Sequence, residues 1–162
     1  MVRAAVLLAL LLLGVLPAHA AQLPRVAFFG FSLINTSLEP TKPEEAARIK
    51  MIDELFRQKL DASGKFRIVP ISAEAQKKLG QAAIENCNGC ERDAAIASDA
   101  DWAAWGTVQK VSNLILNINI YMEDARSGKM EFVKSVDIRG NTDDSWQHGL
   151  NYILKNYLLN QP

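Results

Sequence analysis

Apolar and polar residues alternate along residues 113–124, and this two-residue repeat is the clearest structural signal in the chain. One side carries Leu114, Leu116, Ile118, Ile120 and Met122, and the other carries Asn117, Asn119, Tyr121 and Glu123. Successive side chains of a strand point to opposite faces of a sheet, so this stretch predicts a strand with one packed and one polar face. Four more stretches rich in β-branched and aromatic residues predict strands, at residues 25–34, 65–71, 100–111 and 130–140.

Apolar residues spaced three and four apart predict helices between and after these strands. The helical segments are residues 41–62, 73–85, 92–99 and 142–158. In the first of them Thr41 is the expected N-cap, and Glu44 is the expected partner in a capping box.

The predicted elements follow one another in the order β-α-β-α-α-β-β-β-α. Strands separated by helices, followed by a meander and a last helix, indicate an α+β fold, an α/β two-layer sandwich built on a mixed five-strand sheet. Residues 21–162 are of a length that fits a single globular domain.

The first twenty residues have the pattern of a secretory signal peptide. Arg3 gives a short basic region, residues 4–16 are apolar, and Ala18 and Ala20 are the small residues that precede a cleavage point. The apolar run is too short to span a bilayer comfortably. We therefore expect residues 1–20 to be removed near Ala20 and the rest to be periplasmic, without a membrane span.

The charge balance and the motifs of the sequence argue against nucleic-acid binding and against enzymatic activity. The chain has 18 basic and 18 acidic residues, and this balance predicts no electrostatic affinity for nucleic acid. Neither a glycine-rich phosphate loop nor a Gly-x-Ser-x-Gly nucleophile motif occurs in the sequence, so we expect no cofactor and no enzymatic activity. His148 is the one histidine after the signal, and we expect it on the surface rather than in a metal site.

Cys87 and Cys90 are the only cysteines, separated by Asn88 and Gly89. In an oxidising compartment paired cysteines tend to form a disulfide, and Asn-Gly favours the turn that brings them together. A structural disulfide is the leading interpretation. A thiol–disulfide redox centre is the alternative, because a cysteine at a helix start has a stabilised thiolate. A metal or partner contact is the third.

The stretch DADWAAWGTVQKVSNLILNINIYMEDARSGK and the RGNTDDSW entry to the last helix carry a resemblance to known proteins. Residues 25–158 resemble a family of exported bacterial proteins of unknown function. They are also similar to the periplasmic domain of the curli-secretion lipoprotein, to the penicillin-binding-protein activator lipoprotein and to the N-terminal domain of TolB. The resemblance implies a non-catalytic role in which the chain binds another envelope protein or assembles into an oligomer.

Two groups of residues are candidates for binding. Trp105, Asn117, Asn119 and Tyr121 are the expected partner contacts, because amide side chains hydrogen-bond a partner while aromatic rings supply contact area. Asn35, Thr36 and Ser37 follow the first strand, where open α/β sheets often bind ligands, and form a candidate small-ligand loop. The leading hypothesis is a non-enzymatic accessory module that binds an envelope protein; a redox protein and a small-ligand binding protein are the alternatives.

Overall fold

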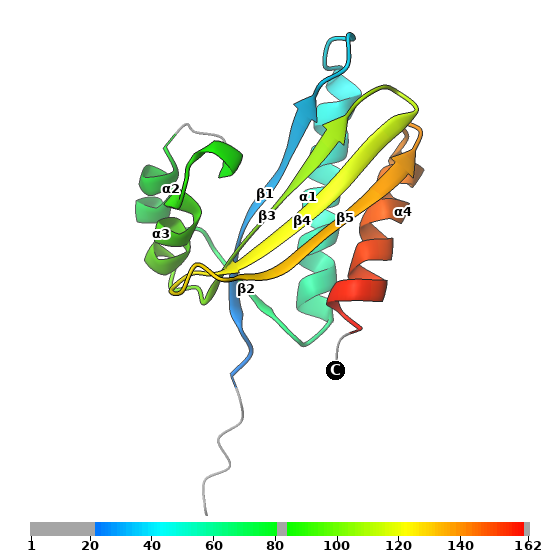
Figure 1. The fold of residues 1–162 in the computed structure, drawn as a ribbon. Coiled ribbons are helices and arrows are strands. Elements are labelled where there is room, and N and C mark those ends of the chain that lie inside the picture. Colours follow the sequence, from blue (N-terminus) through cyan, green and yellow to red (C-terminus); the bar gives the residue numbers. More distant parts are fainter. Residues whose placement is uncertain (1–21, 81–83, 161–162) are drawn as a thin grey trace, which may run out of the picture.

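The computed structural model describes residues 22–80 and 84–160, and its centre is one five-stranded mixed sheet (Figure 1). The strands lie in the order β2-β1-β3-β4-β5. Strand β1 is parallel to β2 and β3, whereas β3, β4 and β5 are antiparallel to their neighbours. The strands are β1 (Arg25–Asn35), β2 (Arg67–Val69), β3 (Trp102–Lys110), β4 (Ile115–Asp124) and β5 (Met130–Arg139). The predicted α+β class and mixed five-strand sheet are confirmed.

The helices occupy the two faces of the sheet unequally (Figure 1). They are α1 (Pro43–Ala62), α2 (Ala73–Leu79), α3 (Cys90–Ala97) and α4 (Asp143–Ile153), with a short 3₁₀ turn η1 (Ile84–Asn86) and a π-helical turn η2 (Leu154–Leu158). Helices α1 and α4 cover one face, and α2 and α3 pack together at one end of the other face. The predicted element order is confirmed.

The sequence also predicts a signal peptide and the absence of a membrane span. The expected signal peptide, residues 1–20, lies outside the described residues. Among the described helices, none combines the length and the apolar character needed to cross a membrane.

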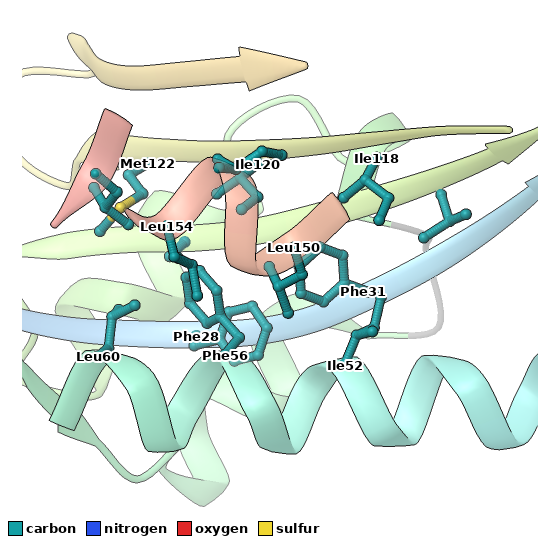
Figure 2. Close-up of a cluster of buried hydrophobic side chains, with 14 of the residues drawn as sticks. Phe28, Phe31, Ile52, Phe56, Leu60, Ile118, Ile120, Met122, Leu150 and Leu154 are labelled. Atoms are coloured by element: carbon teal, nitrogen blue, oxygen red, sulfur yellow. The ribbon is translucent and has the colours of Figure 1, made fainter. Parts of the chain in front are cut away.

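The main core lies between the sheet and helices α1 and α4 (Figure 2). Three phenylalanine rings form its centre, with centroids 4.3 Å apart for Phe28 and Phe56 and 5.9 Å apart for Phe31 and Phe56. Helix α1 contributes Ile52, Phe56 and Leu60, all fully buried, as the helical spacing of apolar residues predicts. From β4 come Leu116, Ile118, Ile120 and Met122, which confirms the packed face of that strand.

A bulge in β1 brings Phe28 and Phe31 to the same side of the sheet. The register with β3 shifts between these two residues, and Gly30 has a φ of +92°, a conformation that favours glycine. Asp53 of α1 accepts a hydrogen bond from the N–H of Phe31 at 2.6 Å and so holds the bulge. The ring of Phe31 then lies against Gly106, where an added Cβ would come within 2.1 Å of it.

Helix α1 starts one residue later than the capping pattern predicts. Lys42 is its N-cap, and Glu45 rather than Glu44 accepts the hydrogen bond from the Lys42 N–H, at 2.9 Å. The helix turn therefore points Glu45 into the protein and leaves Glu44 exposed. Helix α2 is also shorter than predicted, because it ends before Gly80, whose φ is +61°.

Leu114 corrects the predicted packed face of β4. The strand begins at Ile115, and Leu114 lies in the preceding turn with 72% of its surface exposed. Ser112 Oγ accepts hydrogen bonds from the N–H groups of Leu114 and Ile115 and stabilises this turn. The alternation of apolar residues therefore continues past the point where the strand itself begins.

Candidate functional site

The part of the sheet that α2 and α3 leave uncovered forms a polar face, which we call the open sheet face. It is built by the outward side chains of β3, β4 and β5, including Thr107, Ile115, Asn117, Asn119, Tyr121, Val133, Ser135 and Asp137. The register sets these residues opposite one another on neighbouring strands, so their side chains lie within reach of each other. The sequence predicts Asn117, Asn119 and Tyr121 on one face, and the structure places them there.

Hydrogen bonds across the strands hold the amide side chains of the open sheet face. Asn119 Nδ2 donates to Thr107 Oγ1 at 3.0 Å, and Asn117 Nδ2 donates to Asp137 Oδ1 at 2.9 Å. Ser135 Oγ donates to Asn117 Oδ1 at 3.0 Å. The polar side chains are therefore ordered before any partner binds, and this lowers the entropy that binding would cost.

Exposed apolar side chains flank this hydrogen-bonded row. Ile115 is 45% exposed and Val133 is 55% exposed. The combination of ordered polar groups with accessible apolar area is typical of protein-binding surfaces.

Trp105 and Tyr121 stand at the boundary between the open sheet face and the end that α2 and α3 cover. Their rings are stacked, with centroids 5.3 Å apart and planes 17° apart. Trp105 is only 9% exposed and belongs to a second, smaller core with Ala27, Ala95 and Ala103. Tyr121 is half-buried, so it is the more accessible of the two rings.

The candidate ligand loop uses its polar atoms to hold its own shape. Asn35 Oδ1 accepts hydrogen bonds from both the N–H and the Oγ of Ser37, at 3.1 and 2.6 Å. The N–H and Oγ1 of Thr36 both donate to the carbonyl of Lys110, at 2.9 and 3.0 Å. Asn35, Thr36 and Ser37 therefore fix the loop against β3.

A buried ion pair lies next to this loop, and the pattern of apolar and polar residues in the sequence does not predict it. Lys110 Nζ is 2.6 Å from Glu45 Oε1, and both side chains are fully buried. Asn141 Nδ2 donates to the same carboxylate oxygen at 2.6 Å. The detectable signal is that Lys110 occupies an inward position of β3, two residues after the buried Val108.

Three elements meet at this pair: the start of α1, the end of β3 and the entry to α4. Burial alone would raise the pKa of Glu45, but hydrogen bonds from Lys110, the Lys42 N–H and Asn141 outweigh it and hold the pKa below its usual value. Asn141 Oδ1 in turn accepts a hydrogen bond from Trp146 Nε1 at 3.1 Å. The folded structure therefore stabilises the ionised form of the Glu45 carboxylate.

This charge predicts loss of stability in acid. A carboxyl whose pKa is lower in the folded than in the unfolded state stabilises the fold above its unfolded pKa, about 4.5, and that contribution is lost as the pH falls through the folded pKa. We expect the free energy of unfolding, measured in urea, to fall from pH 5 to pH 3. Glu45→Gln should flatten this slope, whereas Glu44→Gln should not. Equal slopes for wild type and Glu45→Gln would contradict the assignment.

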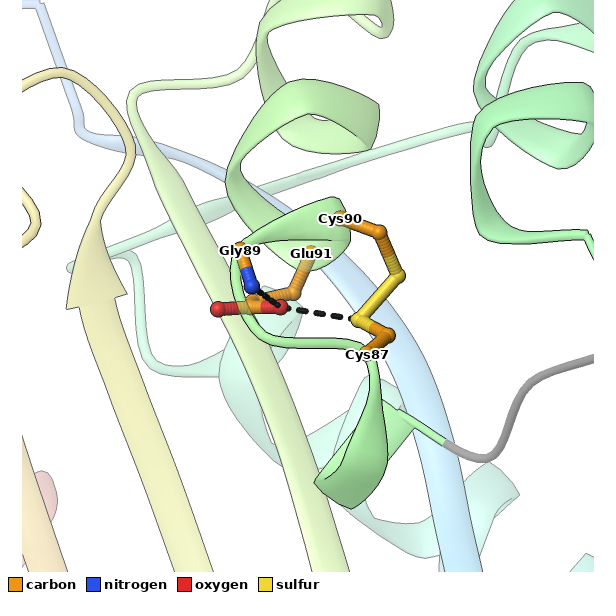
Figure 3. Close-up of a disulfide and its surroundings, with 4 residues drawn as sticks. All are labelled: Cys87, Gly89, Cys90 and Glu91. Carbon is orange, nitrogen blue, oxygen red and sulfur yellow. Dashed lines mark hydrogen bonds between the residues drawn. A yellow bond between two sulfur atoms is a disulfide. The ribbon is translucent and has the colours of Figure 1, made fainter.

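Cys87 and Cys90 form a disulfide, with a Cα–Cα distance of 5.4 Å (Figure 3). The carboxylate of Glu91 lies beside it, where Oε2 accepts the N–H of Gly89 at 3.1 Å and is 3.0 Å from Cys87 Sγ. A disulfide sulfur carries no proton, so only the Gly89 N–H donates to this carboxylate. After reduction, the same negative charge would disfavour a thiolate at Cys87.

The disulfide closes a short loop, and its contribution to stability can be measured. Replacing both cysteines by serine should lower the free energy of unfolding by about 2 kcal/mol, the chain-entropy value for so short a loop. Urea unfolding under non-reducing conditions tests this. Adding a reductant to the wild type should reproduce the loss and should leave the double variant unchanged.

Comparisons with known proteins agree with this architecture. Residues 24–158 match the model of a family described as "Protein of unknown function (DUF2380)". Among solved structures, the LpoB C-terminal domain from Salmonella enterica is similar at 14% identity, with 72% of this chain and 82% of that chain covered and a TM-score of 0.52. Lipoprotein GNA1162 from Neisseria meningitidis is similar at 13% identity, with 85% and 98% covered and a TM-score of 0.55.

A third similar structure is the PelC dodecamer from Paraburkholderia phytofirmans, at 14% identity, with 82% of this chain and 85% of that chain covered and a TM-score of 0.50. No curated protein matches the chain. At these identities the likeness establishes the fold, and the expected resemblance in fold is confirmed.

Proposed function

The chain belongs to the family described as "Protein of unknown function (DUF2380)", which names no activity, and on this premise we propose a function from the site: a non-enzymatic periplasmic module that binds another envelope protein. The binding surface is the open sheet face. The observation that carries the proposal is its row of hydrogen-bonded amides, flanked by exposed Ile115 and Val133 on a surface that no helix of the described residues covers.

The described chemistry of the chain supports a binding role more than a catalytic one. In residues 22–80 and 84–160, His148 is the only histidine, it is exposed, and no hydrogen bond joins it to a serine or cysteine. Hydrolases of the Ser–His and Cys–His classes need such a pairing. Among the similar structures are a lipoprotein and a protein that forms a dodecamer, and both agree with a role in the envelope or in an assembly.

Export is part of the proposal. A disulfide persists in oxidising compartments, and Cys87–Cys90 is closed in this structure. The alternative role as a thiol–disulfide redox protein has less support, because the Glu91 carboxylate beside Cys87 disfavours the nucleophilic thiolate. The alternative of a small ligand near Asn35–Ser37 also has less support, because that loop uses its polar atoms internally.

Substitutions on the open sheet face test the proposal. We expect a specific envelope protein to be recovered with the tagged full chain after mild crosslinking in the native host. Tyr121→Ala should reduce that recovery about tenfold or more, because an aromatic anchor at an interface contributes at least 1–2 kcal/mol. Because Tyr121 also packs on Trp105, Ile115→Arg is the second variant, placing a charge on the same face without removing core contacts.

The matched control is Gln58→Ala, on the exposed side of α1 and away from the open sheet face. All variants should keep the wild-type circular dichroism spectrum. If Tyr121→Ala and Ile115→Arg retain wild-type recovery of the same partner, the open sheet face is not its binding site. If the folded wild type recovers no partner at all, the binding function itself is wrong.

A further inference from the structure

We propose that the outer edge of β5 pairs antiparallel with β5 of a second copy of this chain, so that two sheets join into one. This goes beyond the proposed function and does not depend on it, because it concerns the backbone edge of the sheet and not its open face. The edge, its free hydrogen-bonding groups and its charge pattern carry the proposal.

Strand β5 is the last strand of the sheet, so one side of its backbone has no neighbouring strand (Figure 1). The N–H of Gly140 donates to the carbonyl of Leu114 at 3.1 Å, which shows that Gly140 points toward the β4 side. Because backbone direction alternates along a strand, Ile138 and Val136 also point toward β4. Val133, Ser135 and Asp137 therefore point their N–H and C=O groups outward.

These outward groups are available for pairing. In the part of the chain that the structure describes, no hydrogen bond outside the β4–β5 ladder uses the backbone N–H or C=O of Val133, Ser135 or Asp137, and the direction of Gly140 places these groups on the side away from β4. The outward carbonyl of Arg139 accepts from Ser145 Oγ at 2.8 Å, and this contact ends the free stretch. A ten-residue edge strand without proline is a template for another strand.

The β1 side of the sheet differs, because side chains of α1 occupy backbone groups there. Asp53 accepts a hydrogen bond from the Phe31 N–H at 2.6 Å, and Arg57 Nη2 donates to the Phe28 carbonyl at 3.0 Å.

Beside β5, a groove of about 420 Å³ between the strand and α4 is lined by Val136, Ile138 and Tyr152, among others. An added strand would therefore lie next to open space and apolar surface.

The charges along β5 favour a second copy and select one register. With Ser135 opposite Ser135 of the second copy, Val133 lies opposite Asp137, and Glu131, the extra residue of the bulge at this end of β5, lies near Arg139. By symmetry the opposite-charge pair Glu131–Arg139 forms twice, and such pairs stabilise neighbouring strands. No like charges face each other in this register.

Neighbouring registers lose this complementarity. Moving the centre of symmetry to Lys134 sets Lys134 opposite Lys134 and Glu131 opposite Asp137, which are repulsive pairs. Moving it to Val136 places Glu131 beyond the reach of Arg139. A dyad at Ser135 also keeps both α4 helices, each with its exposed Tyr152, on the same face of the joined sheet.

Cysteine crosslinking tests the register directly. In the proposed pair the two Ser135 Cα atoms are about 5.5 Å apart, within the range that a disulfide spans. Ser135→Cys should therefore form a covalent dimer when copper phenanthroline and oxygen accept the two electrons and two protons released. Asp137→Cys is the matched control, because its copies would be about 14 Å apart along the strands and should not crosslink.

Two further variants test hydrogen bonds and charges separately, by sedimentation over a range of protein concentrations. Val133→Pro removes an outward N–H without removing a bond to β4, and should abolish the dimer; Val133→Ala keeps the N–H and should retain it. Glu131→Arg should weaken self-association about tenfold, because two attractive pairs become repulsive. Adding Arg139→Glu should restore it.

The proposal fails if the folded wild type sediments as a monomer at all concentrations and Ser135→Cys does not crosslink. It also fails if Asp137→Cys crosslinks as well as Ser135→Cys, because the edge would then pair in another register or by chance collision. Failure here leaves recovery of an envelope partner through the open sheet face unaffected, so the two proposals are distinguishable.

Discussion

Replacing Glu45 by alanine is expected to lower the free energy of unfolding by about 3–5 kcal/mol, the typical cost of leaving one charge of a buried ion pair without its partner. Lys110 is fully buried, and its ammonium group is 2.6 Å from Glu45 Oε1. The substitution also removes the acceptor for the Lys42 N–H and for Asn141. Urea unfolding at pH 7 measures the loss.

A double variant that also replaces Lys110, the partner of Glu45, shows whether the ion pair causes this loss of stability. Glu45→Leu combined with Lys110→Met replaces both charges by apolar groups of similar size, and this double variant should recover most of the lost stability. Glu44→Ala, one residue away and exposed, should change stability by less than about 0.5 kcal/mol. If the double variant is as unstable as Glu45→Ala, the ion pair is not the reason for the loss.

Phe56→Ala is the other substitution with a large expected effect, a loss of about 3–5 kcal/mol. Phe56 is fully buried at the centre of the main core, and its ring contacts those of Phe28 and Phe31 (Figure 2). Removing it leaves a cavity between α1 and β1, next to the rings of Phe28 and Phe31. Urea unfolding should show a lower midpoint with an unchanged slope.

Phe56→Leu is the matched control and should cost less than Phe56→Ala, because leucine fills most of the volume. Gln58→Ala, on the opposite side of the same helix, should be nearly neutral. Equal losses for the leucine and alanine variants would indicate that ring contacts, and not the filling of volume, determine the stability of this core.

The parts of the fold that follow one periodicity were predictable from the sequence. Strand β4 alternates without interruption from Leu116 to Met122, and α1 repeats Ile52, Phe56 and Leu60 at helical spacing. The bulge of β1 was not predictable, because strict alternation pairs Phe29 with Phe31 on one face. The extra residue at Gly30 instead pairs Phe28 with Phe31, and it depends on Asp53 from another element.

The sequence likewise predicts one part of the candidate site and not the rest. The common face of Asn117, Asn119 and Tyr121 follows from alternation alone. Their partners Thr107 and Asp137 depend on strand register, which local sequence does not specify. The ion pair joins residues 65 positions apart, so only the inward placement of Lys110 was detectable beforehand.

The segment between β1 and α1 is anchored on both sides, by Thr36 on the Lys110 carbonyl and by Lys42 on Glu45. Between these anchors Leu38 projects fully into solvent. A fluorophore or an epitope attached at Leu38 would therefore sit on a fixed support without touching the core, the open sheet face or the β5 edge. This makes residue 38 a suitable labelling position for following the protein inside the cell.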